Sequence, residues 1–143
     1  MVFFANLVGT FLAAYLFGSI GIASPEQLSV FIDISKKAIL TKDSMEIFLT
    51  GIPAGLILAA MVWMLPSARN HSSFIIIIMT YIIAIGGFAH VIAGSTEAFL
   101  LLLTNNTSLS VCFNYILFAA LGNIIGGSVL FSLLTYAQIR HEI

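Results

Sequence analysis

Long apolar runs are the feature of this sequence that most restricts its fold. Two of them are close to the ~20 residues that a helix needs to cross the hydrocarbon core of a bilayer, and the other two are longer. The four runs cover residues 2–23, 47–65, 74–103 and 109–137. They predict an all-α integral membrane protein with four membrane segments.

The composition supports the same environment. The chain has 143 residues, of which 60% are hydrophobic and 8% are charged. A soluble domain of this length needs more polar surface to cover its core. The net charge of −1 provides no basic surface for nucleic acid. The expected surroundings are therefore the lipid bilayer, with multi-pass insertion and no nucleic-acid partner.

A segment of mixed polarity, residues 26–40, separates the first two runs. Its apolar residues can face lipid while its charged residues face water, which predicts an interfacial helix. The apolar set is Leu28, Phe31, Ile32, Ile39 and Leu40, and the charged set is Asp33, Lys36 and Lys37.

The run at 74–103 is too long for one straight membrane helix. Its 30 residues would measure ~45 Å as a continuous helix, against a hydrocarbon core of ~30 Å. Gly86 and Gly87 lie near its middle, where each costs about 1 kcal/mol relative to alanine. We expect a break there, with half-helices at roughly 74–85 and 91–103. The alternative is a strongly tilted continuous helix with packing glycines.

Two segments of the chain resemble each other. "ANLVGTFLAAYL" at 5–16 and "GNIIGGSVLFSLL" at 122–134 share a small residue, an asparagine, two apolar residues and a glycine in the same order. Asparagines within spans usually form hydrogen bonds between helices, and small residues spaced by four allow helices to approach closely. The expected packing residues are Asn6, Gly9, Gly51, Gly55, Gly122, Asn123 and Gly126. A substrate contact by either asparagine is the alternative.

The positions of the two matching segments suggest an inverted repeat. The second copy lies three spans after the first, an odd shift that would reverse its orientation in the membrane. In the second copy, the asparagine helix follows an ordinary span and a broken one. The first copy lacks both, so we expect the chain to be a truncated form of a longer protein.

Four motifs resemble the formate/nitrite transporter family in order and spacing. They are "NLVG" at 6–9, "AAMVWML" at 59–65, "GFAHVIAG" at 87–94 and "GNIIGG" at 122–127. The resemblance covers the family's third to sixth membrane segments. It implies an incomplete aquaporin-like fold, a homopentamer in the bacterial inner membrane, and passage of small monovalent anions such as formate, nitrite or hydrosulfide, or of their acids.

The resemblance also assigns pore residues. His90 matches the family's central pore histidine, with Phe88 beside it in the same motif, and Ile83 falls where the family usually has a phenylalanine at its cytoplasmic constriction. Several positions depart from the family: Ala89 replaces its usual glutamate, Ala93-Gly94 replaces "AN", and Gly55 replaces an asparagine. The family's lysine at the start of its fourth segment is also missing, although Lys42 lies three residues away. The chain therefore resembles a divergent branch.

His90 and Glu97 are the ionisable candidates of the broken run. An anion crossing a low-dielectric pore faces a desolvation penalty that a weak acid avoids by taking up a proton, and histidine, with an unperturbed pKa of about 6.5, suits the exchange. A structural, hydrogen-bonded histidine is the alternative. Glu97 follows seven residues later, ~10 Å away on nearly the same helical face. It is either a proton-relay or vestibule charge, or a structural partner of Lys36, Lys37 or Lys42.

Other chemistry finds little support in the sequence. Cys112 lies in an apolar run, and His71 and His141 lie outside the spans, so we expect no metal site and no cofactor. No paired-carboxylate or Ser/His constellation indicates an enzyme. The leading hypothesis is a channel or transporter. The alternatives are a non-transporting truncated fragment and an accessory half that needs a separately encoded partner.

Overall fold

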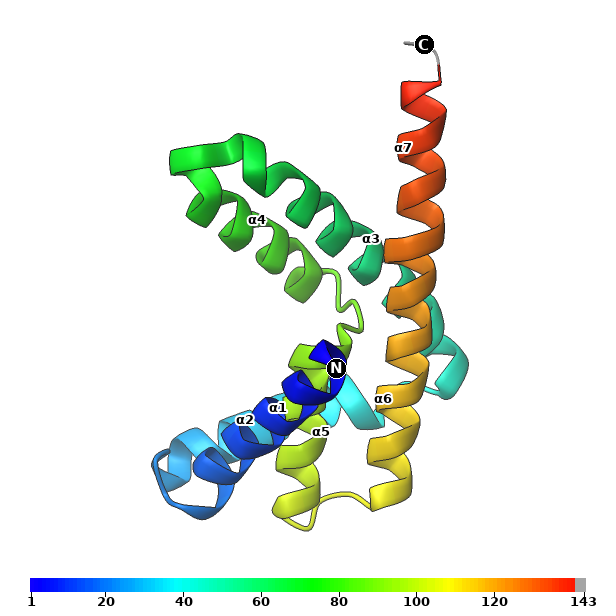
Figure 1. Ribbon diagram of the computed structural model, residues 1–143. Coiled ribbons are helices and arrows are strands. Elements are labelled where there is room, and N and C mark those ends of the chain that lie inside the picture. The colour runs from blue at the N-terminus through cyan, green and yellow to red at the C-terminus, as the bar shows by residue number, and fades with distance from the viewer. Residues whose placement is uncertain (141–143) are drawn as a thin grey trace. The chain divides into compact units, whose positions relative to one another are not determined.

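The computed structural model describes residues 1–140, the side chain of residue 69 excepted, and the described chain is helical apart from short connections (Figure 1). In chain order the helices are α1 (Val2–Ser19), α2 (Pro25–Leu40), α3 (Ser44–Ala68), η1 (Arg69–His71), α4 (Ser72–Ile85), α5 (Val91–Leu103), α6 (Leu109–Ile124), η2 (Ile125–Leu130) and α7 (Phe131–Ile139). The prediction of an all-α chain is confirmed for the described residues.

Three of these helices are long and apolar enough to cross a membrane. They are Val2–Ser19, Ser44–Ala68 and the continuous run Leu109–Ile139, which joins α6, η2 and α7. Helices α4 and α5 are shorter and apolar, and the break between them falls at the predicted glycines. These features confirm a multi-pass integral membrane protein with one interrupted segment.

Local signals explain the ends of α1 and α2. Helix α1 ends at Ser19, before the expected residue 23, and Gly21 adopts a φ of +76° that favours glycine. Helix α2 begins with a capping box. The Ser24 hydroxyl accepts from the Gln27 amide at 3.3 Å, and the Gln27 side chain accepts from the Ser24 amide at 3.0 Å. Pro25 occupies the first turn, where its missing N–H is harmless.

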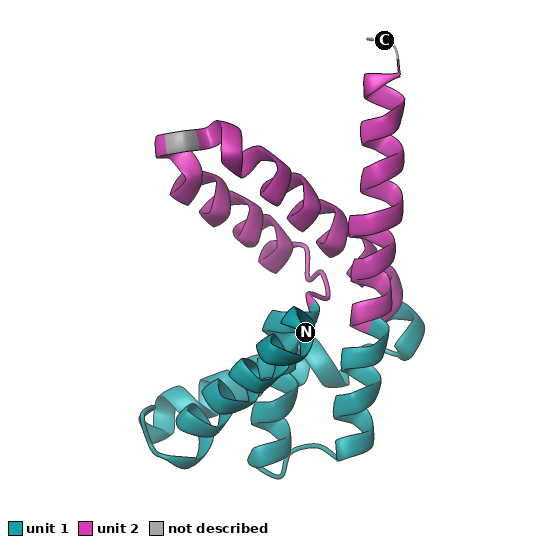
Figure 2. Ribbon diagram, viewed as in Figure 1, with its two compact units in different colours: residues 1–46, 91–118 teal, residues 47–90, 119–143 magenta. Residues whose placement is uncertain are grey.

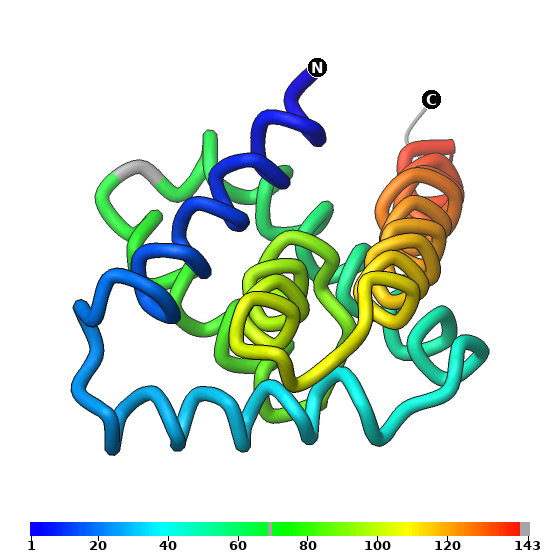
Figure 3. Tube along the Cα trace, turned by 90° about the horizontal axis from the view of Figure 1, so that it is seen from below, coloured from blue at the N-terminus to red at the C-terminus, as the bar shows by residue number. Residues whose placement is uncertain are grey.

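The chain divides into two compact units, coloured separately in Figure 2. The first comprises residues 1–46 and 91–118, and within it α1 and α2 both pack against α5, as can be followed along the trace in Figure 3. Hydroxyl groups join α1 to α5, because the Ser95 hydroxyl lies 2.9 Å from that of Thr10 in a buried contact. Tyr115 of α6 fills the space that a side chain at position 94 would need.

The second unit comprises residues 47–90 and 119–143. In it, backbone meets backbone where α3 passes the end of α6 and η2. A methyl group at Gly126 would overlap the carbonyl oxygen of Ile52, and one at Gly55 would overlap the backbone of Asn123. Gly51 and Gly122 face each other in the same contact. The two small-xxx-small spacings thus lie against one another, the close approach that such spacing permits.

The helix widens within this contact. Residues Ile125–Leu130 form a π-helix, η2, between the α-helical turns of α6 and α7. Single π-helical turns are rare within α-helices and are found frequently at functional sites. The sequence pattern contained no signal for this change.

Candidate functional site

The interrupted segment begins where α4 is stopped by a glycine cap. Gly87 has a φ of +59°, its amide donates to the Ala84 carbonyl at 3.1 Å, and the Phe88 amide donates to the Ile83 carbonyl at 3.1 Å. This pair of bonds is a Schellman motif with Gly87 at the left-handed position. At this positive φ the Cβ of any other residue would be strained. Glycine at position 87 therefore favours the end of the helix here.

Two bonds from other helices then hold the non-helical backbone. The Ala89 amide donates to the carbonyl of Thr50 on α3 at 3.2 Å, and the Ala89 carbonyl accepts from the side-chain amide of Asn123 at 2.7 Å. In a hydrocarbon environment, irregular backbone is tolerated only where its polar groups are satisfied in this way. Both main-chain groups of residue 89 therefore have protein partners.

Asn123 connects three parts of this unit. Besides Ala89, its side-chain amide donates to the carbonyl of Gly51 on α3 at 2.9 Å. The amide NH₂ has two hydrogens, and these two bonds use both. Sequence reasoning placed Asn123 between helices, but missed that it also holds the break. The available signal was an asparagine flanked by glycines in a segment that follows a broken helix.

The expected pore residues of the second unit cluster around this break. His90 is half-buried and directly precedes α5, and Phe88 is also half-buried. Ile83 is 8% exposed in the last turn of α4. The Phe88 ring covers Gly86 so closely that a side chain at position 86 would collide with it. One short stretch of chain thus contains Ile83, Phe88 and His90. The glycine cap at Gly87 and the two hydrogen bonds of Ala89 hold the backbone of this stretch.

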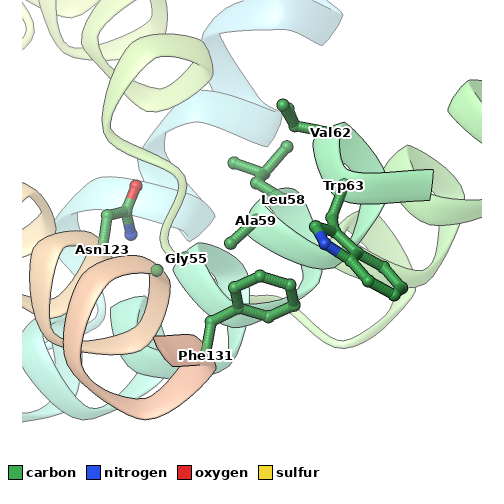
Figure 4. A pocket seen from close by; sticks show the side chains of 8 residues that line it. Gly55, Leu58, Ala59, Val62, Trp63, Asn123 and Phe131 are labelled. Atoms are coloured by element: carbon green, nitrogen blue, oxygen red, sulfur yellow. The ribbon is translucent and has the colours of Figure 1, made fainter. Parts of the chain in front are cut away.

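A groove of about 470 Å³ extends from Asn123 along α3 (Figure 4). Asn123 and Gly55 lie at one end of the view and Trp63 at the other, with Phe131 beside the middle. The rings of Trp63 and Phe131 pack edge-on with centroids 6.4 Å apart. Position 55 has no room for a side chain, because the backbone of Asn123 occupies that space.

Glu97 lies in the first unit, on α5. It is half-buried and faces a hollow that Ser35 and Thr96 also line. Lys42 and Tyr115 are its electrostatic neighbours, so of the three lysines considered as partners the structure favours Lys42. Sequence reasoning did not include Ser35 or Thr96 among the candidates.

The remaining candidate residues lie neither at the break before α5 nor at the hollow beside Glu97. Asn6 is exposed, and a methyl group at Gly9 would meet nothing within 4 Å in the described chain. Their role in helix packing stays a prediction. His71 ends η1, and His141 lies outside the described residues.

Comparisons with known proteins point to one family. The profile of the formate/nitrite transporter family matches residues 1–137. The chain is 34% identical to the inner membrane protein YfdC of Escherichia coli (strain K12) over 143 residues, which are 99% of this chain and 46% of that protein. The chain therefore spans about half the length of this relative. No solved structure matches it.

Proposed function

Because this chain belongs to the formate/nitrite transporter family, we propose that it forms part of a membrane pore for small monovalent anions or their protonated acids, with His90 as the central proton-exchanging group. The relative is named an inner membrane protein, and we extend that location to this chain. By family resemblance, the pore would belong to a homopentamer. The family consists of transporters and not of enzymes.

The observation that carries the proposal is the anchored break before α5. A pore histidine has to sit where the helix is interrupted, on backbone that neighbouring helices hold in place. The bonds from Ala89 to Thr50 and Asn123 provide that support for the residue directly before His90. His90 itself is half-buried, so the protein partly encloses it.

The chemistry follows from the cost of moving charge. An anion entering a low-dielectric passage loses solvation worth several kcal/mol. A weak acid that gains a proton there crosses as a neutral molecule. An imidazole can give that proton and recover it at near-neutral pH, because its ordinary pKa of about 6.5 lies close to physiological pH. Ile83 and Phe88, both apolar and next to the break, would limit the width of the passage.

The alternative proposals are a non-transporting truncated fragment and an accessory half that needs a separately encoded partner. Both alternatives are relevant because the chain covers 46% of the relative's length. Either would leave the anchored break as a structural element, with His90 a hydrogen-bonded residue in it. Glu97 faces a different hollow, in the first unit.

The test is uptake of radiolabelled formate into proteoliposomes as a function of external pH. We expect uptake to rise as the pH falls, and His90→Phe to abolish that pH dependence. His71→Phe is the matched control, because His71 lies in η1 outside the long apolar helices. Unchanged pH-dependent uptake by His90→Phe would remove His90 from the mechanism. Absence of uptake by the wild-type chain would favour the fragment or the accessory half.

A further inference from the structure

The motif "GIPAG" at 51–55 places a proline between two glycines inside α3. In a helix, proline is about 3 kcal/mol and glycine about 1 kcal/mol less favourable than alanine. The close contact with α6 and η2 explains Gly51 and Gly55, because a side chain at either position would meet the backbone of α6. Close approach does not explain Pro53, because its ring is larger than the methyl group of alanine, which a helix prefers.

The backbone directly before Pro53 is used by other parts of the second unit. The Thr50 carbonyl accepts from the Ala89 amide at 3.2 Å, and the Gly51 carbonyl accepts from the side-chain amide of Asn123 at 2.9 Å. The Ile52 carbonyl oxygen occupies the space where a side chain at position 126 would lie. Three successive carbonyl groups of α3 thus meet partners outside their own helix.

The covalent structure of proline accounts for this use of the backbone. Proline has no N–H to donate to the carbonyl four residues earlier, and its ring collides with that carbonyl, so a helix widens and bends at the turn before it. In α3 this turn runs from Leu49 to Pro53 and contains Thr50, Gly51 and Ile52. Membrane helices tolerate proline where neighbouring helices supply new partners for the backbone groups that are set free.

We propose that Pro53 is a positioning residue for the break before α5: it opens the turn of α3 that presents the Thr50 carbonyl to the Ala89 amide. This bond holds the residue directly before His90, so Pro53 acts on the histidine through the backbone. The effect of Pro53 on transport rests on the proposed function of His90. Its effect on the bond between Thr50 and Ala89 does not.

The test is hydrogen exchange of the Ala89 amide in the full chain carrying Pro53→Ala, resolved by fragmentation mass spectrometry in detergent. Alanine restores an N–H donor to the Leu49 carbonyl, so the Thr50 carbonyl should turn back toward the helix axis. We expect the Ala89 amide to exchange roughly fivefold faster than in the wild type, the factor that corresponds to about 1 kcal/mol for one hydrogen bond. Unchanged exchange in the folded variant would overturn the proposal.

Pro66→Ala is the matched control, because Pro66 also lies inside α3 but at an exposed position near its C-terminal end. It should leave the exchange of Ala89 unchanged. Thermal unfolding separates a local effect from a general one. Alanine is the better helix former, so Pro53→Ala should unfold at the same or a higher temperature than the wild type while Ala89 exchanges faster.

Three results would count against the local role of Pro53. They are equally fast exchange of Ala89 in Pro66→Ala, a lower unfolding temperature of Pro53→Ala with faster exchange in every helix, and failure of the variants to fold. Pro53→Leu also restores the N–H and replaces Pro53→Ala if that variant does not fold. Failure of both to fold would mean that Pro53 is needed by the whole chain and would overturn a role at the break.

Uptake of radiolabelled formate into proteoliposomes connects the bond to transport. Pro53→Ala should lower uptake several-fold at acidic external pH and flatten its pH dependence toward that of His90→Phe, while Pro66→Ala should behave like the wild type. Faster exchange of Ala89 with unchanged uptake would overturn the link to His90. If the wild-type chain takes up no formate, the proposed function fails, and the exchange of Ala89 still decides whether Pro53 positions the break.

Discussion

Among single residues, Asn123 makes the connection with the most consequences. Its amide joins α6 to α3 through Gly51 and to the interrupted segment through Ala89. Two carbonyl oxygens accept hydrogen bonds from this one side chain: that of Gly51 lies within α3, and that of Ala89 lies in the non-helical segment. Losing the side chain would leave both carbonyls without this donor in an apolar environment.

Asn123→Ala should therefore lower the free energy of unfolding by about 2 kcal/mol, since an unsatisfied buried acceptor costs about 1–3 kcal/mol. Asn123→Asp should be worse, because a carboxylate would place oxygens against two carbonyl oxygens. Thermal unfolding in detergent measures both. Asn70→Ala, at an exposed position in η1, is the control and should unfold like the wild type. An Asn123→Asp variant as stable as the wild type would show that these hydrogen bonds contribute little.

At the scale of secondary structure, the contact of α3 with α6 and η2 depends on glycine. Gly126 has no room for a side chain because the Ile52 carbonyl occupies the space, whereas Gly9 on α1 has open space around it in the described chain. The two glycines occupy corresponding positions in the two similar segments of the sequence. They provide a matched pair for a substitution experiment.

Gly126→Ala should separate the helices and cost about 1–3 kcal/mol, the range for overpacking a close contact. Gly9→Ala should be neutral or stabilise the chain by up to about 1 kcal/mol, because alanine favours a helix more than glycine does. The difference between the two unfolding midpoints is the measurement. Equal destabilisation by both substitutions would mean that α1 also has a close neighbour at Gly9.

The elements differ in how far the sequence could predict them. The length of the run at 74–103 and its two glycines were enough to place the break, because both features are local. The two bonds that hold the break were not predictable, since the Thr50 carbonyl and the Asn123 amide reach Ala89 only once α3 and α6 have packed. The hollow at Glu97 was missed for the same reason: Ser35 and Thr96 are ordinary residues until α2 and α5 meet.

For the whole molecule, the two long apolar helices α1 and α3 and the amphipathic helix between them predict which chain segments lie on the same side of the membrane. Helices α1 and α3 are each long enough to cross, while α2 is amphipathic and expected to lie along one surface. The chain segments before and after α2 should therefore be on the same side of the membrane. The segment after α3 should be on the other side.

Single cysteines introduced in a Cys112→Ser background test this topology. Ser24→Cys and Thr41→Cys, at the two ends of α2, should react with a membrane-impermeant maleimide from the same side, and Asn70→Cys only from the opposite side. Comparing the labelling of intact cells with that of permeabilised cells shows on which side of the membrane each cysteine lies. Reaction of positions 24 and 41 from opposite sides would mean that α2 crosses the membrane, and the interfacial assignment would be wrong.

The bonding of Ala89 also bears on how this segment can change over evolution. Its amide and its carbonyl both have partners on other helices, so the residue is anchored by atoms that every amino acid except proline possesses. The side chain at this position contributes neither bond. A change of side chain at position 89 would therefore alter the charge or size of the group beside His90 while leaving both backbone bonds available to hold the segment.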